Sequence, residues 1–234
     1  MKEPPLLIKD ILGIPEHIVI LGKSVYIAHV VYTWIIMALF LLVVFILSRG
    51  IKPLPAGLQN FFEMVVDGIL KFMEDIIGHH SSQYLPLIGT LAFFILISNL
   101  IGLVPGFMSP TSNINTTAAC AIIVFVATHY YGIKSHGIGY LKHFLGPVLW
   151  LAPLMIILEV IGHFARVLSL SIRLFGNIFG EDLILLVLVF LIPVLVPLPM
   201  MALAVFTSVV QTFVFVLLSI MYIRLATEEA EEGH

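Results

Sequence analysis

Charged side chains are scarce in this sequence. Asp, Glu, Lys and Arg make up 11% of its 234 residues, whereas hydrophobic residues make up 60%. A soluble domain carries about 25% charged residues, which cover its surface and keep it in water. The shortage therefore excludes an ordinary soluble protein of this length and predicts an integral membrane protein.

Cysteine and the common cofactor motifs are also missing or nearly so. Cys120 is the only cysteine, which excludes an intrachain disulfide. The sequence has no C-x-x-C pair, no Walker loop and no G-x-G-x-x-G, so we expect no metal, nucleotide or other cofactor. The basic residues are scattered along the chain, which argues against a nucleic-acid partner.

The N-terminal segment lacks a continuous apolar run. Lys9, Asp10 and Glu16 interrupt the apolar residues there, so no clean hydrophobic region of a signal peptide exists. We predict that residues 1–25 lie outside the bilayer or along its surface, and a disordered tail is an equal alternative for the first ten. Residues 26–234 are then expected to form a single membrane domain.

Long apolar segments dominate the rest of the chain and predict an all-α membrane fold. A bilayer core of about 30 Å needs about 20 apolar residues in a helix. Five segments are predicted to cross it, at about 26–47, 85–104, 117–133, 147–190 and 200–226. The stretch at about 57–77 differs, because polar residues recur in it every three or four positions, which predicts an amphipathic interfacial helix.

The last two crossings are unusually long. Residues 147–190 would make one helix of about 66 Å, twice the thickness of the bilayer core. Two perpendicular spans would fit the length, but no turn signal separates them, so we predict one steeply tilted helix. Pro193, Pro197 and Pro199 mark a turn, and the final two helices should form a hairpin. The distribution of Lys and Arg predicts an external N-terminus and a cytoplasmic C-terminus.

Polar residues form one stripe along the fourth predicted crossing. At 100° per residue, six of them fall within a sector of about 80°. They are Glu159, His163, Arg166, Arg173, Asn177 and Glu181. Ser208, Gln211, Thr212, Ser219 and Tyr222 form a weaker stripe within about 100° on the last helix. A turn near Ile192 would place Arg173 and Gln211 at similar depth, facing each other.

Arg173 is the most telling residue of the stripe. An arginine at the centre of a membrane helix costs about 2.5–3.5 kcal/mol on insertion scales, and its guanidinium does not deprotonate. Glu181 and Glu159 lie two and four turns away, too far for direct contact. We therefore expect a carboxylate from another protein to meet Arg173; the alternative is a structural arginine that binds helix carbonyls and Gln211.

Titratable groups lie at both ends of the stripe. Glu159 and Glu181 could relay protons, because a carboxyl group gains and loses them readily. His163 lies one turn from Glu159, and imidazole is a common proton carrier; a helix–helix hydrogen bond is the alternative role for it. The hydroxyl and amide groups of Ser208, Gln211, Thr212 and Tyr222 would complete a proton path on the last helix.

Two motifs resemble subunit a of F-type ATP synthases, the proton-channel subunit of the bacterial enzyme. One is Ser169-Leu-Ser-Ile-Arg173-Leu-Phe-Gly-Asn177, and the other is the Gln-bearing final helix from Val210-Gln211 to Tyr222. The loop that begins at Asn113-Ile-Asn115, the five crossings and the acidic C-terminal end are similar too. The resemblance covers most of the chain.

The resemblance implies a non-catalytic stator subunit in a bacterial inner membrane. Its partners would be a rotating c-ring with mid-membrane carboxyls, the subunit b peripheral stalk, the rest of the ATP synthase and membrane lipid. Two offset half-channels would load and unload protons on the ring. Arg173 would be the essential arginine, with Asn177 and Gln211 near it and Glu159 as the acid of the cytoplasmic half-channel.

The sequence departs from the family pattern at two positions. The family often has an acid nine residues after the arginine; that residue is Asp182 here, but helical angle favours the adjacent Glu181, and both stay open. Ala204 replaces a histidine that bacterial members often carry seven residues before the glutamine. Protons are the default ion. An ion-coupled secondary transporter is the rival function, although neither repeats nor paired half-helices are visible in the sequence.

Overall fold

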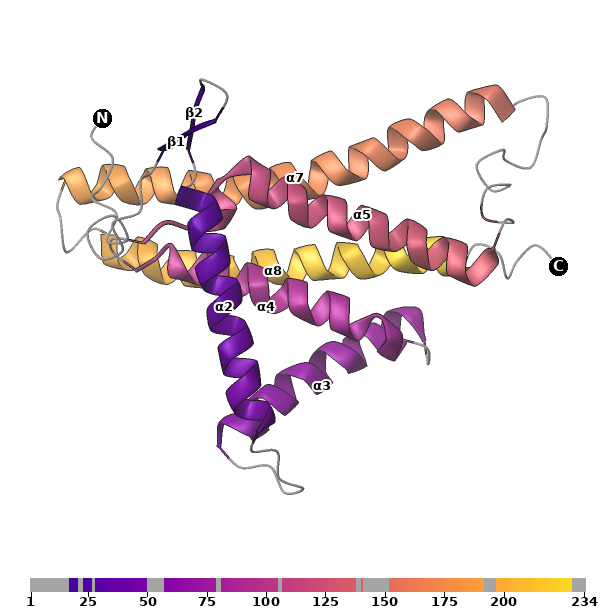
Figure 1. The fold of residues 1–234 in the computed structure, drawn as a ribbon, viewed down its shortest axis with the longest axis horizontal. Helices are drawn as coiled ribbons and strands as arrows, with labels where there is room; N and C mark the ends of the chain where they lie inside the picture. The colour runs from indigo at the N-terminus through magenta and orange to yellow at the C-terminus, as the bar shows by residue number, and fades with distance from the viewer. Residues whose placement is uncertain are drawn as a thin grey trace.

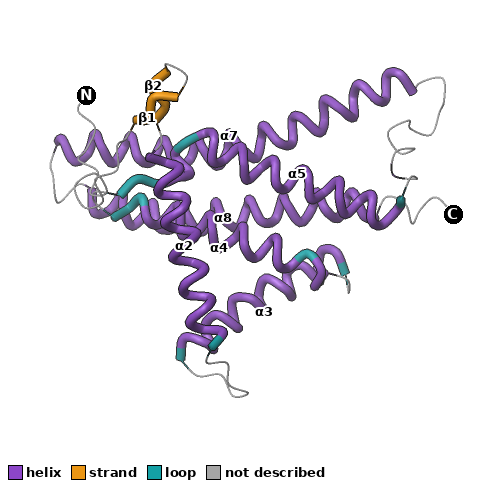
Figure 2. The backbone as a smooth tube through the Cα atoms, viewed as in Figure 1, coloured by secondary structure: helices purple, strands orange, loops and turns teal. Residues whose placement is uncertain are grey.

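A computed structural model describes residues 17–20, 23–26, 28–49, 57–78, 81–104, 107–137, 140, 152–191 and 197–228. The described architecture is helical (Figures 1 and 2). Its helices are α2 (Ala28–Ser48), α3 (Leu58–Ile77), α4 (Leu85–Ile101), α5 (Ile114–His136), α7 (Ala152–Leu191) and α8 (Pro197–Glu228). Two short 3-10 turns, η1 (Ser81–Gln83) and η2 (Pro110–Ser112), precede α4 and α5.

The apolar helices confirm the all-α, multi-pass membrane class. By length and composition α2, α5, α7 and α8 can each cross a membrane, and α4 is a shorter apolar helix at the second predicted crossing. The 40 residues of α7 extend for about 60 Å, so this helix fits a core of about 30 Å only at a steep slant. In Figure 1, α2 runs across the long axes of α7 and α8.

Helices α7 and α8 form the predicted antiparallel hairpin. Three side-chain contacts join them, Asn177 with Gln211, Glu181 with Thr207 and Arg166 with Tyr222, and the residue numbers of each pair average 194. The last crossing begins three residues earlier than predicted, at Pro197. Pro197 and Pro199 therefore belong to the first turn of α8, where a missing backbone N–H removes no helical hydrogen bond.

Helix α5 packs antiparallel against α7. Near the start of α5, the hydroxyls of Thr117 and Ser171 lie 3.3 Å apart, and near its end His129 lies beside His163. A buried cluster from α4, α5, α7 and α8 holds this layer together. Its members are Leu91, Ile95, Cys120, Ala121, Val124, Leu170, Leu174, Ile178 and Phe215.

The amphipathic helix α3 forms over the predicted residues and packs by its apolar side. Met73 is fully buried in a second cluster with Ile88 of α4 and Ile220 of α8. On the opposite side Glu63 and Asp67 are exposed. The helix ends at Gly78, whose φ of 91° lies in a region that other residues rarely adopt.

A small β-hairpin near the N-terminus was not predicted. Strands β1 (His17–Ile20) and β2 (Lys23–Tyr26) pair antiparallel. Tyr26 therefore ends a strand, and the first crossing begins at Ala28. The remainder of the segment 1–25 lies outside the described residues, as does the predicted start of the fourth crossing at 147–151.

Gly102 allows the end of α4 to approach the chain that follows it. A Cβ at this position would lie 2.7 Å from the Cβ of Ser109 and 3.3 Å from its backbone nitrogen. Ser109 is held there, because its hydroxyl donates to the carbonyl of Ser98 at 2.8 Å. We expect Gly102→Ala to destabilise the subunit by about 1–3 kcal/mol through overpacking, measured as a lower thermal midpoint of the assembled complex.

Gly89→Ala, within α4, is the control, since nothing lies within 4 Å of a Cβ built there. An unchanged midpoint for Gly102→Ala would contradict the close approach of the two segments.

Candidate functional site

The polar stripe of α7 lies at the edge of its packed face. Leu170, Leu174 and Ile178 face the core and are nearly fully buried. The opposite side is apolar and exposed, with Phe164 at 67%. Within the polar stripe, Asn177 and Glu181 contact α8, whereas His163 contacts α5. The stripe residues thus lie where a polar group can reach α8, α5 or a protein outside the chain.

Arg173 is exposed on this edge. Its guanidinium donates one long hydrogen bond, from Nη2 to the Ser169 hydroxyl at 3.4 Å. Within the described parts of the chain no carboxylate forms an ion pair with it. A guanidinium has five N–H donors, so most of these donors make no hydrogen bond within the parts of the chain that the structure describes.

Asn177 and Gln211 form the central contact between α7 and α8. The Asn177 amide Nδ2 donates to Gln211 Oε1 at 2.5 Å. Gln211 is only 4% exposed, and its Nε2 has no hydrogen-bond partner among the described residues. The expectation that Arg173 faces Gln211 at equal depth is wrong by one helical turn. The hairpin register is centred on 194 rather than 192, which places Asn177 opposite Gln211 and Arg173 opposite Phe215.

The two adjacent carboxylates of α7 point to different neighbours. Glu181 accepts a hydrogen bond from the hydroxyl of Thr207 on α8. Asp182 lies beside Ser112 of η2, at the turn that precedes α5. Successive helical residues are about 100° apart, so one α7 turn presents an acid to each of two neighbours.

Thr207 is a site residue that the sequence reasoning missed. At 100° per residue, Thr207 lies about 40° outside the sector of α8 that holds the other polar residues, on the side of Gln211. Its position one turn before Gln211 was the signal that could have identified it. The neighbouring alanine, Ala204, is fully buried, so this position of α8 is closely packed.

The remaining predicted polar groups of α8 mostly bond their own helix. Thr212 and Ser219 donate to backbone carbonyls one turn earlier, at 2.8 Å each. Ser208 is 1% exposed, and its hydroxyl has no partner among the described residues. The Arg166 guanidinium carbon lies over the ring of Tyr222, 5.6 Å from the ring centroid. The described side chains alone therefore form no continuous hydrogen-bonded chain along α8.

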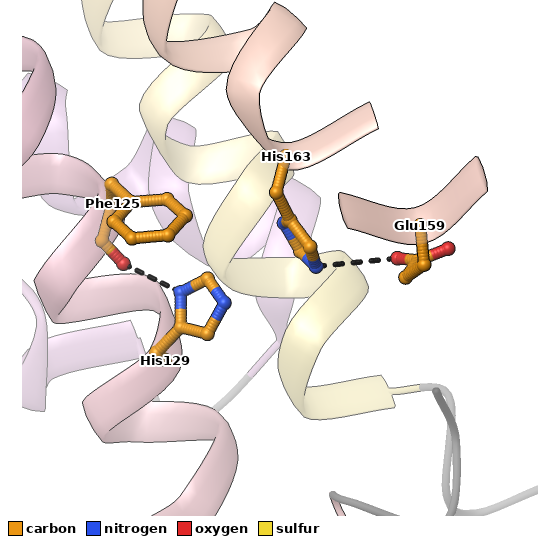
Figure 3. Close-up of polar contacts among 4 residues, drawn as sticks. All are labelled: Phe125, His129, Glu159 and His163. Atoms are coloured by element: carbon orange, nitrogen blue, oxygen red, sulfur yellow. Dashed lines mark hydrogen bonds and ion pairs between the residues drawn. The ribbon is translucent and has the colours of Figure 1, made fainter. Parts of the chain in front are cut away.

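A second polar group lies near the start of α7. His163 Nε2 is 3.3 Å from Glu159 Oε1, and Figure 3 shows this pair facing His129 of α5. Glu159 lies 14 residues before Arg173, about 21 Å along the helix, and Glu181 lies eight residues after it, about 12 Å. Arg173 thus separates two groups of titratable and polar side chains on one continuous helix.

The fold and the site define a class: a multi-pass, all-α membrane protein in which an exposed arginine divides a polar stripe on a long hairpin. The family model described as ATP synthase A chain matches residues 30–224, and the chain belongs to this family.

Relatives match it over most of their length. "ATP synthase subunit a" of Geotalea uraniireducens (strain Rf4) is 56% identical over 205 residues, 88% of each chain. "ATP synthase subunit a 1" of Pelobacter propionicus is 57% identical over 86% of this chain and 88% of its own. "ATP synthase subunit a" of Geobacter sulfurreducens is 54% identical over the same shares.

Proposed function

We propose that this chain is the proton-translocating stator subunit of an F-type ATP synthase. In that role it loads and unloads protons on the mid-membrane carboxylates of a rotating c-ring and so couples the proton gradient to ATP synthesis. The exposed Arg173 guanidinium carries this proposal, because no described carboxylate of the chain neutralises it. A permanent cation in a membrane helix needs a partner, and a ring carboxylate would supply one from outside.

The electrostatics of Arg173 suit that exchange. A fixed positive charge stabilises the ionised form of a carboxyl that comes near it, so a ring carboxyl loses its proton on approach. The same charge disfavours a proton passing directly along the stripe from one end to the other. Protons then cross the membrane only by travelling on the ring.

The polar groups on either side of Arg173 serve as two offset half-channels in this proposal. Glu159 and His163 serve the cytoplasmic half-channel. Asn177, Gln211 and Glu181 serve the external half-channel, with Asp182 as the alternative acid and hydroxyls of α8 beside them. The proposed proton-path residues on α8 are Ser208, Gln211, Thr212 and Tyr222.

The proposed setting follows from charge distribution and resemblance. Residues 26–234 act as one domain in a bacterial inner membrane, with the N-terminus outside and the C-terminus in the cytoplasm. The c-ring, the subunit b stalk and the rest of the ATP synthase are the proposed partners. In this role the chain only transfers protons, so it is a non-catalytic component of the complex.

An ion-coupled secondary transporter is less well supported. Such transporters place their ion site at broken helices near the middle of the membrane. Here α7 is helical without interruption over 40 residues, and Arg173 lies within that unbroken stretch.

Aqueous labelling along α7 tests the two half-channels. After removal of the native Cys120, which is buried, single cysteines are placed at the stripe positions and exposed to a membrane-impermeant thiol reagent from one side at a time. We expect positions 159, 163 and 166 to react from the cytoplasmic side and positions 177 and 181 from the outside. The lipid-facing control Phe164→Cys, at 67% exposure, should react from neither side.

Labelling of all stripe positions from a single side would contradict a barrier at Arg173 and return the transporter to consideration. Equal labelling of position 164 would contradict a water path confined to the stripe.

A further inference from the structure

We propose that His129 of α5 is a further proton-relay residue that exchanges protons with His163 and, through it, with Glu159. This inference rests on the proposed proton-translocating function and extends it from α7 to a second helix. No pattern in the sequence singles out His129, because its residue type and position fit an ordinary helix-packing histidine.

The three side chains form a short series across the α5–α7 interface. Glu159 Oε1 lies 3.3 Å from His163 Nε2. The imidazole rings of His163 and His129 are 4.7 Å apart between centroids, with planes inclined by 57°. Figure 3 shows the rings facing each other from opposite helices, with Glu159 on the far side of His163. His163 is thus placed between a carboxylate and a second imidazole.

One contact determines which nitrogen of His129 exchanges protons. Its Nδ1 lies 2.8 Å from the backbone carbonyl of Phe125. A carbonyl can only accept, so Nδ1 must carry a hydrogen in this contact. In the neutral ring Nε2 is then an acceptor, and it lies on the side of the ring toward His163 (Figure 3). The helix backbone therefore orients His129 to take a proton from the direction of His163.

The charges around the pair favour a single shared proton. His129, His163, Arg166 and Tyr222 line one pocket between α5, α7 and α8. Arg166 carries a permanent positive charge, and two neighbouring imidazolium rings beside it would repel each other and the guanidinium. This repulsion favours one extra proton on the pair, which can pass from one ring to the other or to Glu159.

The transfer involves only O–H and N–H bonds. A proton leaves the Glu159 carboxyl and binds His163 Nε2, which gives a carboxylate and an imidazolium. The imidazolium then releases its Nδ1 proton to His129 Nε2, while the hydrogen on His129 Nδ1 stays bonded to that nitrogen and hydrogen-bonded to the Phe125 carbonyl. Every step is reversible, as a channel that runs in both directions requires.

Two substitutions separate a relay from a structural role. His129→Asn keeps an amide donor near the Nδ1 position for the Phe125 carbonyl, and His129→Phe keeps a ring of similar size to pack against His163. Neither residue can carry a proton. ATP-driven proton pumping is measured in inverted vesicles that contain the whole ATP synthase with this chain, normalised to ATP hydrolysis and to the amount of assembled subunit.

We expect both variants to pump at least about fivefold more slowly, which is below the ~10²-fold typical of a positioned acid–base group because water substitutes in part. D₂O should also slow pumping by a larger factor in both variants than in the wild type, since proton transfer has become rate-limiting. His136→Asn is the matched control, because His136 also contacts a carbonyl, that of Thr227 at 2.9 Å, but lies about two turns further along α5 than His129.

Wild-type pumping in either His129 variant would overturn the relay, because one preserved structural contact would then suffice. An unchanged D₂O effect in slowed variants would do the same. Both results leave the proposed function intact, whereas the failure of that function is detected separately, by pumping that survives Arg173→Ala.

Discussion

Arg173→Ala is expected to abolish ATP-driven proton pumping while the complex still assembles. The side chain is exposed and its one described hydrogen bond is long, so truncation removes little packing within the subunit. It does remove the permanent charge that, in the proposed mechanism, holds a ring carboxylate in its ionised form and separates the two half-channels. Pumping is measured by acidification of inverted vesicles, and assembly by the yield of intact complex.

Arg173→Lys should fail to a large extent too. Lysine presents a compact ammonium in place of a planar guanidinium with five donors, and it can lose its proton in an apolar site. Arg49→Ala is the control, since that guanidinium lies over the Phe45 ring at 4.2 Å, far from the stripe in sequence. Coupled pumping at the wild-type rate in Arg173→Ala would show that the arginine is structural and would contradict the proposed function.

Glu181→Gln is expected to have the second largest effect, slowing pumping by about tenfold or more. The Glu181 carboxylate accepts from Thr207 on α8, on the same side as the Asn177–Gln211 contact. A carboxamide keeps the size of the side chain but cannot exchange a proton. The pumping rate in vesicles, again normalised to assembled complex, is the measurement.

Asp182→Asn is the matched comparison, because Asp182 lies next to Glu181 but faces Ser112 instead of α8. We expect it to keep most of the pumping rate, and Glu63→Gln, on the exposed side of α3, to keep all of it. A larger loss for Asp182→Asn than for Glu181→Gln would move the external acid to Asp182, nine residues after Arg173.

The lengths and positions of the helices could be predicted because apolar length is a local property of the chain. The predicted crossings agree with α2, α4, α5, α7 and α8 to within a few residues at most described ends. The hairpin at residues 17–26 could not be foreseen, since strands of four residues carry little pattern and depend on pairing.

The stripe on α7 was likewise visible in the sequence. An α-helix repeats every 3.6 residues whatever surrounds it, so Glu159 to Glu181 share one side of α7 in any structure that keeps it helical. The expectation that Arg173 meets a partner from outside the chain also followed from the sequence, because a guanidinium stays charged and the nearest acids of its own helix are turns away.

Which neighbour each polar group meets was decided only by the packing of helices against one another. Asn177 rather than Arg173 lies opposite Gln211, Glu181 meets Thr207, and His163 meets His129. A shift of a few residues in the register between two antiparallel helices changes every such pair. That register depends on side chains far apart in the sequence that must interlock in one core, so no local pattern in the chain specifies it.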